Sequence, residues 1–266
     1  MIDFNTPTPA SEASMRLAAT ILLVRDAPEG VEVFMQQRAT AADFGGMYVF
    51  PGGKVDPADS HGEIAALCPG LSDSEASARL GIAEGGLAYW VAALRECFEE
   101  CGVLLAHDAN DLPVDPHAAT ARGRFHTYQQ GLRDGSLSMV DICRSEQMHL
   151  SVRRMRYFSH WITPEGPPRR YNTRFFITEV PADQQADHDE WESVNSVWTR
   201  AQTALDRWRA GELQMIHPTV LTLQSILNVA SVAELLQRVR QGAHLPEWTP
   251  ELGRQGMQKV DYPVSE

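Results

Sequence analysis

Residues 95–102 read Arg-Glu-Cys-Phe-Glu-Glu-Cys-Gly and place three carboxylates beside an arginine. At 100° per residue, Glu96, Glu99 and Glu100 fall within one arc of about 100° on a helix. Carboxylates so close together repel one another, and a hard cation such as Mg²⁺, which prefers oxygen ligands, would remove that repulsion. The spacing suits a divalent metal site, but by itself it is more typical of a solvated helix face, where glutamate is common. Arg95 is predicted to pair with Glu99 and orient it, although an ordinary helix salt bridge is equally compatible.

The helix that carries these residues is predicted over residues 90–101, and Gly102 is predicted to end it. The opposite arc is apolar, as in a helix that packs on a core: Leu87, Trp90, Val91, Leu94, Phe98 and Cys101. Upstream, residues 50–53 read Phe-Pro-Gly-Gly. Because glycine lets a backbone approach a ligand closely, Gly52 and Gly53 are predicted to contact substrate; a bare turn is the alternative.

Together, these two segments resemble the signature of the Nudix hydrolases, which cleave nucleoside diphosphates linked to another group. The usual pattern is a glycine, five residues, a glutamate, seven residues, and then Arg-Glu-hydrophobic-x-Glu-Glu-x-Gly-hydrophobic. The second half is present at residues 95–103, with Cys97 in the hydrophobic slot. The first half is interrupted by an insertion at about residues 56–86, in which Ser72 and Glu75 are predicted to cap the start of a helix that Gly81 ends. Counting forward from Gly53 reaches Asp59 and counting back from Arg95 reaches Leu87, so the first glutamate is left unassigned.

The resemblance implies that Glu96, Glu99 and Glu100 hold Mg²⁺ or Mn²⁺ against the diphosphate of a substrate. A water molecule would attack phosphorus in line, and a carboxylate would orient or deprotonate it. Glu96 or a later acid is predicted for that role. Glu192 is such an acid, because Nudix enzymes often supply one from the loop before the last core strand; a plain loop acid is the alternative. The catalytic residues are therefore expected to be Arg95, Glu96, Glu99 and Glu192.

Residues 161–165 and 169–176 look like the Nudix branch that contains the mammalian peroxisomal and mitochondrial coenzyme A diphosphatase relatives. That likeness implies coenzyme A or acyl-coenzyme A as the substrate. The alternatives are cleavage of NADH or ADP-ribose, and a non-catalytic module that binds a nucleotide metabolite. Arginine offers forked donors to phosphate, which gives further substrate-binding candidates, each of which could also be a surface charge: Arg38, Arg169, Arg170 and Arg174.

The order of the predicted elements indicates an α+β or a layered architecture, and the resemblance implies an α/β/α sandwich with a central mixed sheet. Residues 1–15 are predicted to be a flexible tail, residues 16–212 the Nudix domain, and residues 213–266 a helical extension packed on the same domain. Strands are expected at 17–24, 31–37, 103–105, 158–163, 174–180 and 194–199, and further helices at 115–134, 138–147, 201–210, 218–228 and 231–241.

The charge and the apolar pattern of the chain limit which classes of partner and which compartment we expect. A net charge of −12 argues against nucleic-acid binding and sets a repulsion that any phosphate substrate must overcome locally. No apolar run is long enough to span a bilayer, and no secretory pattern opens the chain, so we expect a cytoplasmic protein with no membrane partner. The four cysteines are expected to be reduced thiols. The sequence does not define the oligomeric state, and a homodimer is one assembly that it allows.

Overall fold

A mixed sheet forms the centre of the protein. The computed structural model describes residues 15–39, 45–163, 169–184, 186 and 193–241 in full, and the backbone of 247–248. Within this part of the chain, eight strands form one sheet in the order β10-β7-β8-β1-β2-β3, while β4 pairs with β1 and β9 with β2. The strands are β1 (Arg16–Ala27), β2 (Gly30–Arg38), β3 (Tyr48–Val49), β4 (Gly52–Lys54), β7 (Arg156–Ile162), β8 (Tyr171–Glu179), β9 (Ser193–Arg200) and β10 (Glu247–Trp248).

The strands predicted at 17–24 and 31–37 are confirmed as β1 and β2, which pair antiparallel from Val24↔Val33 to Ala27↔Gly30. β1 also pairs in parallel with β8 and antiparallel with β4, so the sheet is mixed. Side chains alternate across β1, as in any strand. Ala19, Ile21 and Leu23 enter one core, and Leu22 and Val24 enter the other.

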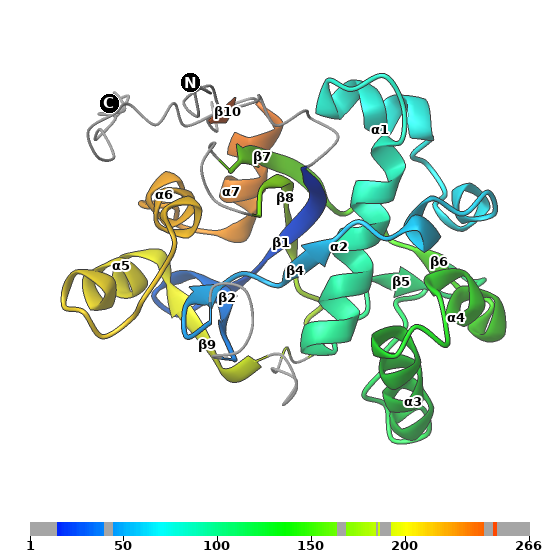
Figure 1. Cartoon of the computed structure of the whole chain (residues 1–266). Helices are drawn as coiled ribbons and strands as arrows, with labels where there is room; N and C mark the ends of the chain where they lie inside the picture. The colour runs from blue at the N-terminus through cyan, green and yellow to red at the C-terminus, as the bar shows by residue number, and fades with distance from the viewer. Residues whose placement is uncertain are drawn as a thin grey trace, which may run out of the picture.

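Helices cover both faces of the sheet, so the predicted α/β/α sandwich is confirmed (Figure 1). On one face α2 (Gly86–Cys101) lies against the sheet, and α1 (Asp73–Leu80) and α3 (Arg122–Arg133) pack on α2, while α4 (Met139–Glu146) contributes to the same core. The other face is covered by α5 (Ala201–Arg209), α6 (His217–Ser225) and α7 (Val232–Arg240). The short strands β5 (Ala106–His107) and β6 (His149–Leu150) form a separate antiparallel pair. In the part of the chain described here, no helix has the length and apolarity that crossing a bilayer requires.

The insertion contains two 3₁₀ turns, η2 (Pro57–Ser60) and η3 (Ile64–Leu67), followed by α1. Ser72 caps α1, its hydroxyl accepting from the Glu75 amide while the Glu75 carboxylate accepts from the Ser72 amide, as predicted. Gly81, with φ 67°, ends the helix. α1 packs closely on the start of α2, because a Cβ on Gly86 would lie 2.2 Å from the Ser77 amide nitrogen.

Two predicted elements are corrected. Residues 103–105 are buried but form no strand, because the Gln184 side chain takes the place of a neighbouring strand. Its Oε1 accepts from the Leu104 amide at 2.8 Å and its Nε2 donates to the Leu104 carbonyl at 2.9 Å. The helix predicted from residue 115 begins only at Arg122, because residues 115–121 form turns in which Asp115 accepts from the His117 amide.

All four cysteines are buried free thiols, as expected. Apart from Met15, the predicted tail lies outside the residues that the structure describes. The boundary predicted at residue 212 stays a prediction.

Candidate active site

Helix α2 carries the predicted site, and its position is fixed by burial and by its end. The apolar arc from Leu87 to Cys101 is buried in the core, as its periodicity predicted. Gly102 ends the helix in the left-handed conformation, with φ 71°. Two side chains of α3 then bind the last carbonyls: Gln129 donates to Phe98 O and Arg133 donates to Glu99 O, each at 2.8 Å. The carboxylates at this end of α2 therefore project from a fixed scaffold.

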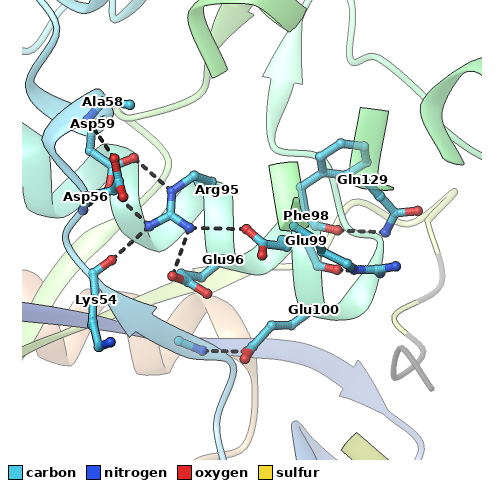
Figure 2. Close-up of polar contacts among 12 residues, drawn as sticks. Lys54, Asp56, Ala58, Asp59, Arg95, Glu96, Phe98, Glu99, Glu100 and Gln129 are labelled. Carbon is cyan, nitrogen blue, oxygen red and sulfur yellow. Dashed lines mark hydrogen bonds and ion pairs between the residues drawn. The ribbon is translucent and has the colours of Figure 1, made fainter. Parts of the chain in front are cut away.

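Arg95 lies at the centre of the polar contacts in Figure 2. Its Nη1 donates to Glu96 Oε1 at 2.9 Å and to Glu99 Oε2 at 3.1 Å. Its Nε and Nη2 donate to the two carboxylate oxygens of Asp59 at 2.9 and 3.1 Å, and Nη2 also donates to the Lys54 carbonyl at 2.8 Å. A guanidinium has five N–H donors, and all five have an acceptor here. The predicted pairing of Arg95 with Glu99 is present, together with two further carboxylates.

Asp59 is the residue that sequence reasoning could not select. It lies on η2 with 1% of its surface exposed, and it also accepts from the Asp56 amide at 2.8 Å. Leu87 occupies the other position at which the first acid of the motif could be expected, and its side chain is buried in the apolar core. Of the two candidate positions, Asp59, which lies within the insertion, is therefore the one whose carboxylate reaches Arg95.

Burial and charge act in opposite directions on this pair. Burial raises the pKa of Asp59 above its usual value, although hydrogen bonds and the charge of Arg95 lower it. Burial alone would lower the pKa of Arg95, but the charge of Glu96 and the contacts with Asp59 and Glu99 raise it well above its ordinary value. Arg95 is therefore held as a cation between three acids.

The glycine turn leaves room for Glu96. A Cβ on Gly53 would lie 2.4 Å from Glu96 Oε1 and 2.5 Å from its carboxyl carbon, so no larger residue fits while Glu96 keeps its place. Gly53 is held there because β4 pairs with β1, with Gly53 opposite Ala19. The Phe-Pro-Gly-Gly turn and the acidic helix are consequently in direct contact. The insertion between them lengthens the usual spacing of the motif by 28 residues, so counting along the sequence could not reveal this contact.

Glu100 is buried, although it lies on the acidic arc of α2, opposite the apolar arc. Only 2% of its surface is exposed, and its Oε2 accepts from the Gly52 amide at 2.8 Å and from Gln36 Nε2 at 2.7 Å. Figure 2 shows it directed away from Arg95, toward the strands. The helical period gives the arc on which a residue lies, but it cannot show that β2 and β4 cover part of that arc. Arg38 Nη1 lies 3.7 Å from Glu100 Oε1, so this predicted substrate-binding arginine is brought to the site.

The donor set suits a hard divalent cation, because it consists of carboxylate oxygens at one end of a helix, and one of these carboxylates lies directly against Gly53. The arrangement in the structure is nevertheless not a ready-made cage. Among the described residues, no three acidic, histidine or cysteine side chains converge as ligands of one ion. Glu96 and Glu99 share Arg95, whereas Glu100 is held by Gly52 and Gln36.

The other predicted residues are placed as follows. Arg174 is on β8, where it lies opposite Ala19, the residue of β1 that also faces Gly53. Arg170 donates from Nε to the Thr163 carbonyl at 3.0 Å, and Arg169 is exposed on the turn before β8. Glu192 lies outside the residues that the structure describes.

Comparisons with family models, with curated sequences and with solved structures agree with one another. The model of the NUDT19 Nudix domain matches residues 71–226, more than half of the chain. The acyl-coenzyme A diphosphatase NUDT19 of Gallus gallus is 24% identical over 83% of this chain and 70% of its own, and that of Homo sapiens is 23% identical over 84% and 68%. The crystal structure of a Nudix hydrolase from Alicyclobacillus acidocaldarius superposes with a TM-score of 0.69 at 26% identity, covering 84% of this chain and 96% of that one.

Proposed function

The chain belongs to the NUDT19 Nudix domain family and is a Nudix hydrolase, and on that premise we propose that it cleaves the diphosphate of coenzyme A or an acyl-coenzyme A with Mg²⁺ or Mn²⁺. One observation carries the proposal. Arg95 holds Glu96 and Glu99 side by side, and the Glu96 carboxylate lies directly against Gly53 of the glycine turn. The substrate class is supported by the relatives, which are named acyl-coenzyme A diphosphatases.

The ligands of the metal ion would be Glu96, Glu99 and Glu100. When bound, the ion supplies positive charge that stabilises the negative charge developing on the transferred phosphoryl group and the leaving oxygen. Arg95 acts as a positioning residue, because its guanidinium fixes the carboxylates of Glu96 and Glu99 and is itself fixed by Asp59. The Gly52 amide holds Glu100 in the same way.

The reaction needs a water molecule and an acceptor for its proton. Water oxygen forms a bond to one phosphorus atom while the bond from that phosphorus to the bridging oxygen breaks, and the proton of the water passes to a carboxylate. We assign that carboxylate to Glu96, with Glu192 as the second candidate. From coenzyme A the products would be 3′,5′-ADP and 4′-phosphopantetheine.

The net charge of −12 repels this substrate at long range, so nearby cations must offset the repulsion. Arg38, at the edge of the carboxylate cluster, is proposed to contact the diphosphate, together with the backbone of Gly52 and Gly53. Arg169 and Arg170, at the turn before β8, are proposed to contact the substrate further out.

The test is product analysis with the purified chain. We would incubate it with Mg²⁺ and, separately, with coenzyme A, acetyl-coenzyme A, NADH and ADP-ribose, using the Glu96→Gln variant as the inactive control. The proposal expects 3′,5′-ADP with phosphopantetheine, or its acylated form, at the highest kcat/KM. A higher kcat/KM for NADH or ADP-ribose would refute the substrate assignment. Binding of these compounds without any turnover would instead indicate a non-catalytic module.

A further inference from the structure

Arg174 is a buried cation that the reaction as described does not require. Only 5% of its surface is exposed. Its Nη1 donates to the Tyr157 hydroxyl at 3.0 Å, and its Nε has no hydrogen-bond partner among the described residues. No carboxylate in that part of the chain forms an ion pair with it. Because an unpaired buried charge is costly, such a residue is typical of a site completed by an anionic ligand.

The sheet places Arg174 close to the acidic helix. Ala19 of β1 lies opposite Gly53 on one side and opposite Arg174 on the other. Gly53 and Arg174 are thus two strand spacings apart, about 10 Å between Cα atoms. Phe176, two residues further along β8, packs into the core that α2 covers, so the Arg174 side chain is on the α2 face.

The surroundings of Arg174 are polar and aromatic. The Tyr157 ring lies beside the guanidinium, with 5.9 Å between the guanidinium carbon and the ring centroid. Tyr89, on the first turn of α2, is buried on the same face of the sheet; burial raises the pKa of its phenol, and the charge of Arg174 lowers it by a smaller amount. Two phenol hydroxyls therefore accompany the cation.

The same face of the sheet is open next to this group. Leu17 and Asn172 lie opposite each other, two positions before Ala19 and Arg174, and therefore on the same face. Leu17 is 46% exposed and Asn172 is half-buried. A ligand that lies over Glu96 and Gly53 can therefore extend along β1 and β8 toward Arg174.

We propose that Arg174, together with Tyr89 and Tyr157, binds a phosphate of the substrate that does not react, namely the 3′-phosphomonoester of coenzyme A. This inference rests on the proposed function. The reacting diphosphate lies at the carboxylates of α2, and a ribose separates it from the 3′-phosphate by a span similar to that between Gly53 and Arg174. The subsite would distinguish coenzyme A from nucleotides that lack this phosphate, because arginine binds a phosphate through two parallel hydrogen bonds.

Nucleotide binding measured by calorimetry, without metal and without turnover, tests the subsite directly. The wild-type chain should bind 3′,5′-ADP about 10- to 100-fold more tightly than 5′-AMP, as expected for hydrogen bonds between charged groups. Arg174→Gln should abolish this preference, and Arg174→Lys should keep part of it. Arg156→Gln is the matched control: it removes one positive charge from β7 opposite Ile177, whose side chain enters the other core, and it should keep the full preference.

Equal affinities of the wild type for the two nucleotides, or a preference that survives in Arg174→Gln, would overturn the proposal. Circular dichroism would establish that each variant is folded. Kinetics with coenzyme A and dephospho-coenzyme A then separate this inference from the proposed function. A selective rise in the KM for coenzyme A in Arg174→Gln supports the subsite, whereas an equal loss with both substrates assigns Arg174 to the reacting diphosphate. If neither compound is cleaved by the wild type, the proposed function fails, and the nucleotide-binding comparison still decides the subsite.

Discussion

Replacing Arg95 with methionine should destabilise the fold in a way that depends on pH. Methionine keeps much of the length of the side chain but removes all five donors, so Asp59 loses both hydrogen bonds from the guanidinium. Asp59 is 1% exposed, and water cannot replace those bonds without opening the structure. Glu96 and Glu99 lose the same partner, but their side chains remain 11% and 15% exposed and keep contact with solvent.

The magnitude follows from the buried carboxyl. Breaking a buried ion pair by removing one partner costs about 3–5 kcal/mol of the free energy of unfolding. Protonation sets an upper limit, because a carboxyl with a pKa of about 3.9 in the unfolded chain costs about 4 kcal/mol to protonate at pH 7. We therefore expect Arg95→Met to lose about 3–4 kcal/mol at pH 7.

The sign of the pH dependence also follows. Burial already raises the pKa of Asp59, and Arg95 is the principal group that lowers it. Without Arg95 the folded variant binds more protons than the unfolded chain between the unfolded pKa and the higher folded pKa, so its stability falls as pH rises through that window. The deficit relative to the wild type should therefore shrink to about 1.5 kcal/mol or less at pH 5, where protonating the same carboxyl costs only about 1.5 kcal/mol.

Urea unfolding at pH 5 and pH 7, with EDTA present, measures this deficit. The control is the double variant Asp59→Asn with Arg95→Met, in which Glu96 and Glu99 lose the same partner but no buried carboxyl is left unpaired. It should be more stable at pH 7 than Arg95→Met alone, and its deficit should vary less with pH. An equal deficit of the single variant at both pH values, or a double variant no more stable than the single one, would show that the Asp59 carboxyl is not the source of the instability.

Three further changes have distinct expected outcomes. Gly53→Ala would place a Cβ 2.4 Å from the Glu96 carboxylate, so turnover of coenzyme A should fall at least about tenfold. The free energy of unfolding should change by less than about 1 kcal/mol. Unchanged turnover would contradict the contact between Gly53 and Glu96. Glu100→Gln should weaken metal binding and, because the carboxylate is buried against the Gly52 amide, should also cost about 1–3 kcal/mol in urea unfolding, which an exposed residue would not. Phe98→Ala should cost about 3–5 kcal/mol in the same assay, since its ring is buried; a loss below 1 kcal/mol would be inconsistent with that packing.

The sequence predicted the elements whose signals are local. The cap at Ser72, the stops at Gly81 and Gly102, and the apolar arc of α2 each depend on residues within one or two turns, and all are present. The strand expected at residues 103–105 was wrong for a non-local reason. These residues are as apolar as a strand, but a glutamine 80 positions away, Gln184, satisfies Leu104 on both its amide and its carbonyl.

The candidate site likewise combines local features that the sequence predicted with non-local contacts that it could not. Helical spacing placed Glu96, Glu99 and Glu100 on one arc, but only the sheet determines that Glu100 faces β2 and β4 while the other two face Arg95. Counting from Gly53 and from Arg95 gave two different positions for the first acid of the motif, Asp59 and Leu87, because an insertion disrupts any fixed spacing. The contact with Arg95 distinguishes them, and a buried acid on η2 could not be recognised without that contact.

Turnover of coenzyme A by the Glu99→Gln variant measures whether the carboxylates that Arg95 holds are required for hydrolysis. With saturating Mg²⁺, we expect a kcat about 100-fold or more below that of the wild type, with 3′,5′-ADP as the wild-type product and a variant that circular dichroism shows to be folded. A variant that releases 3′,5′-ADP at the wild-type rate would contradict the assignment of hydrolysis to the carboxylates that Arg95 holds.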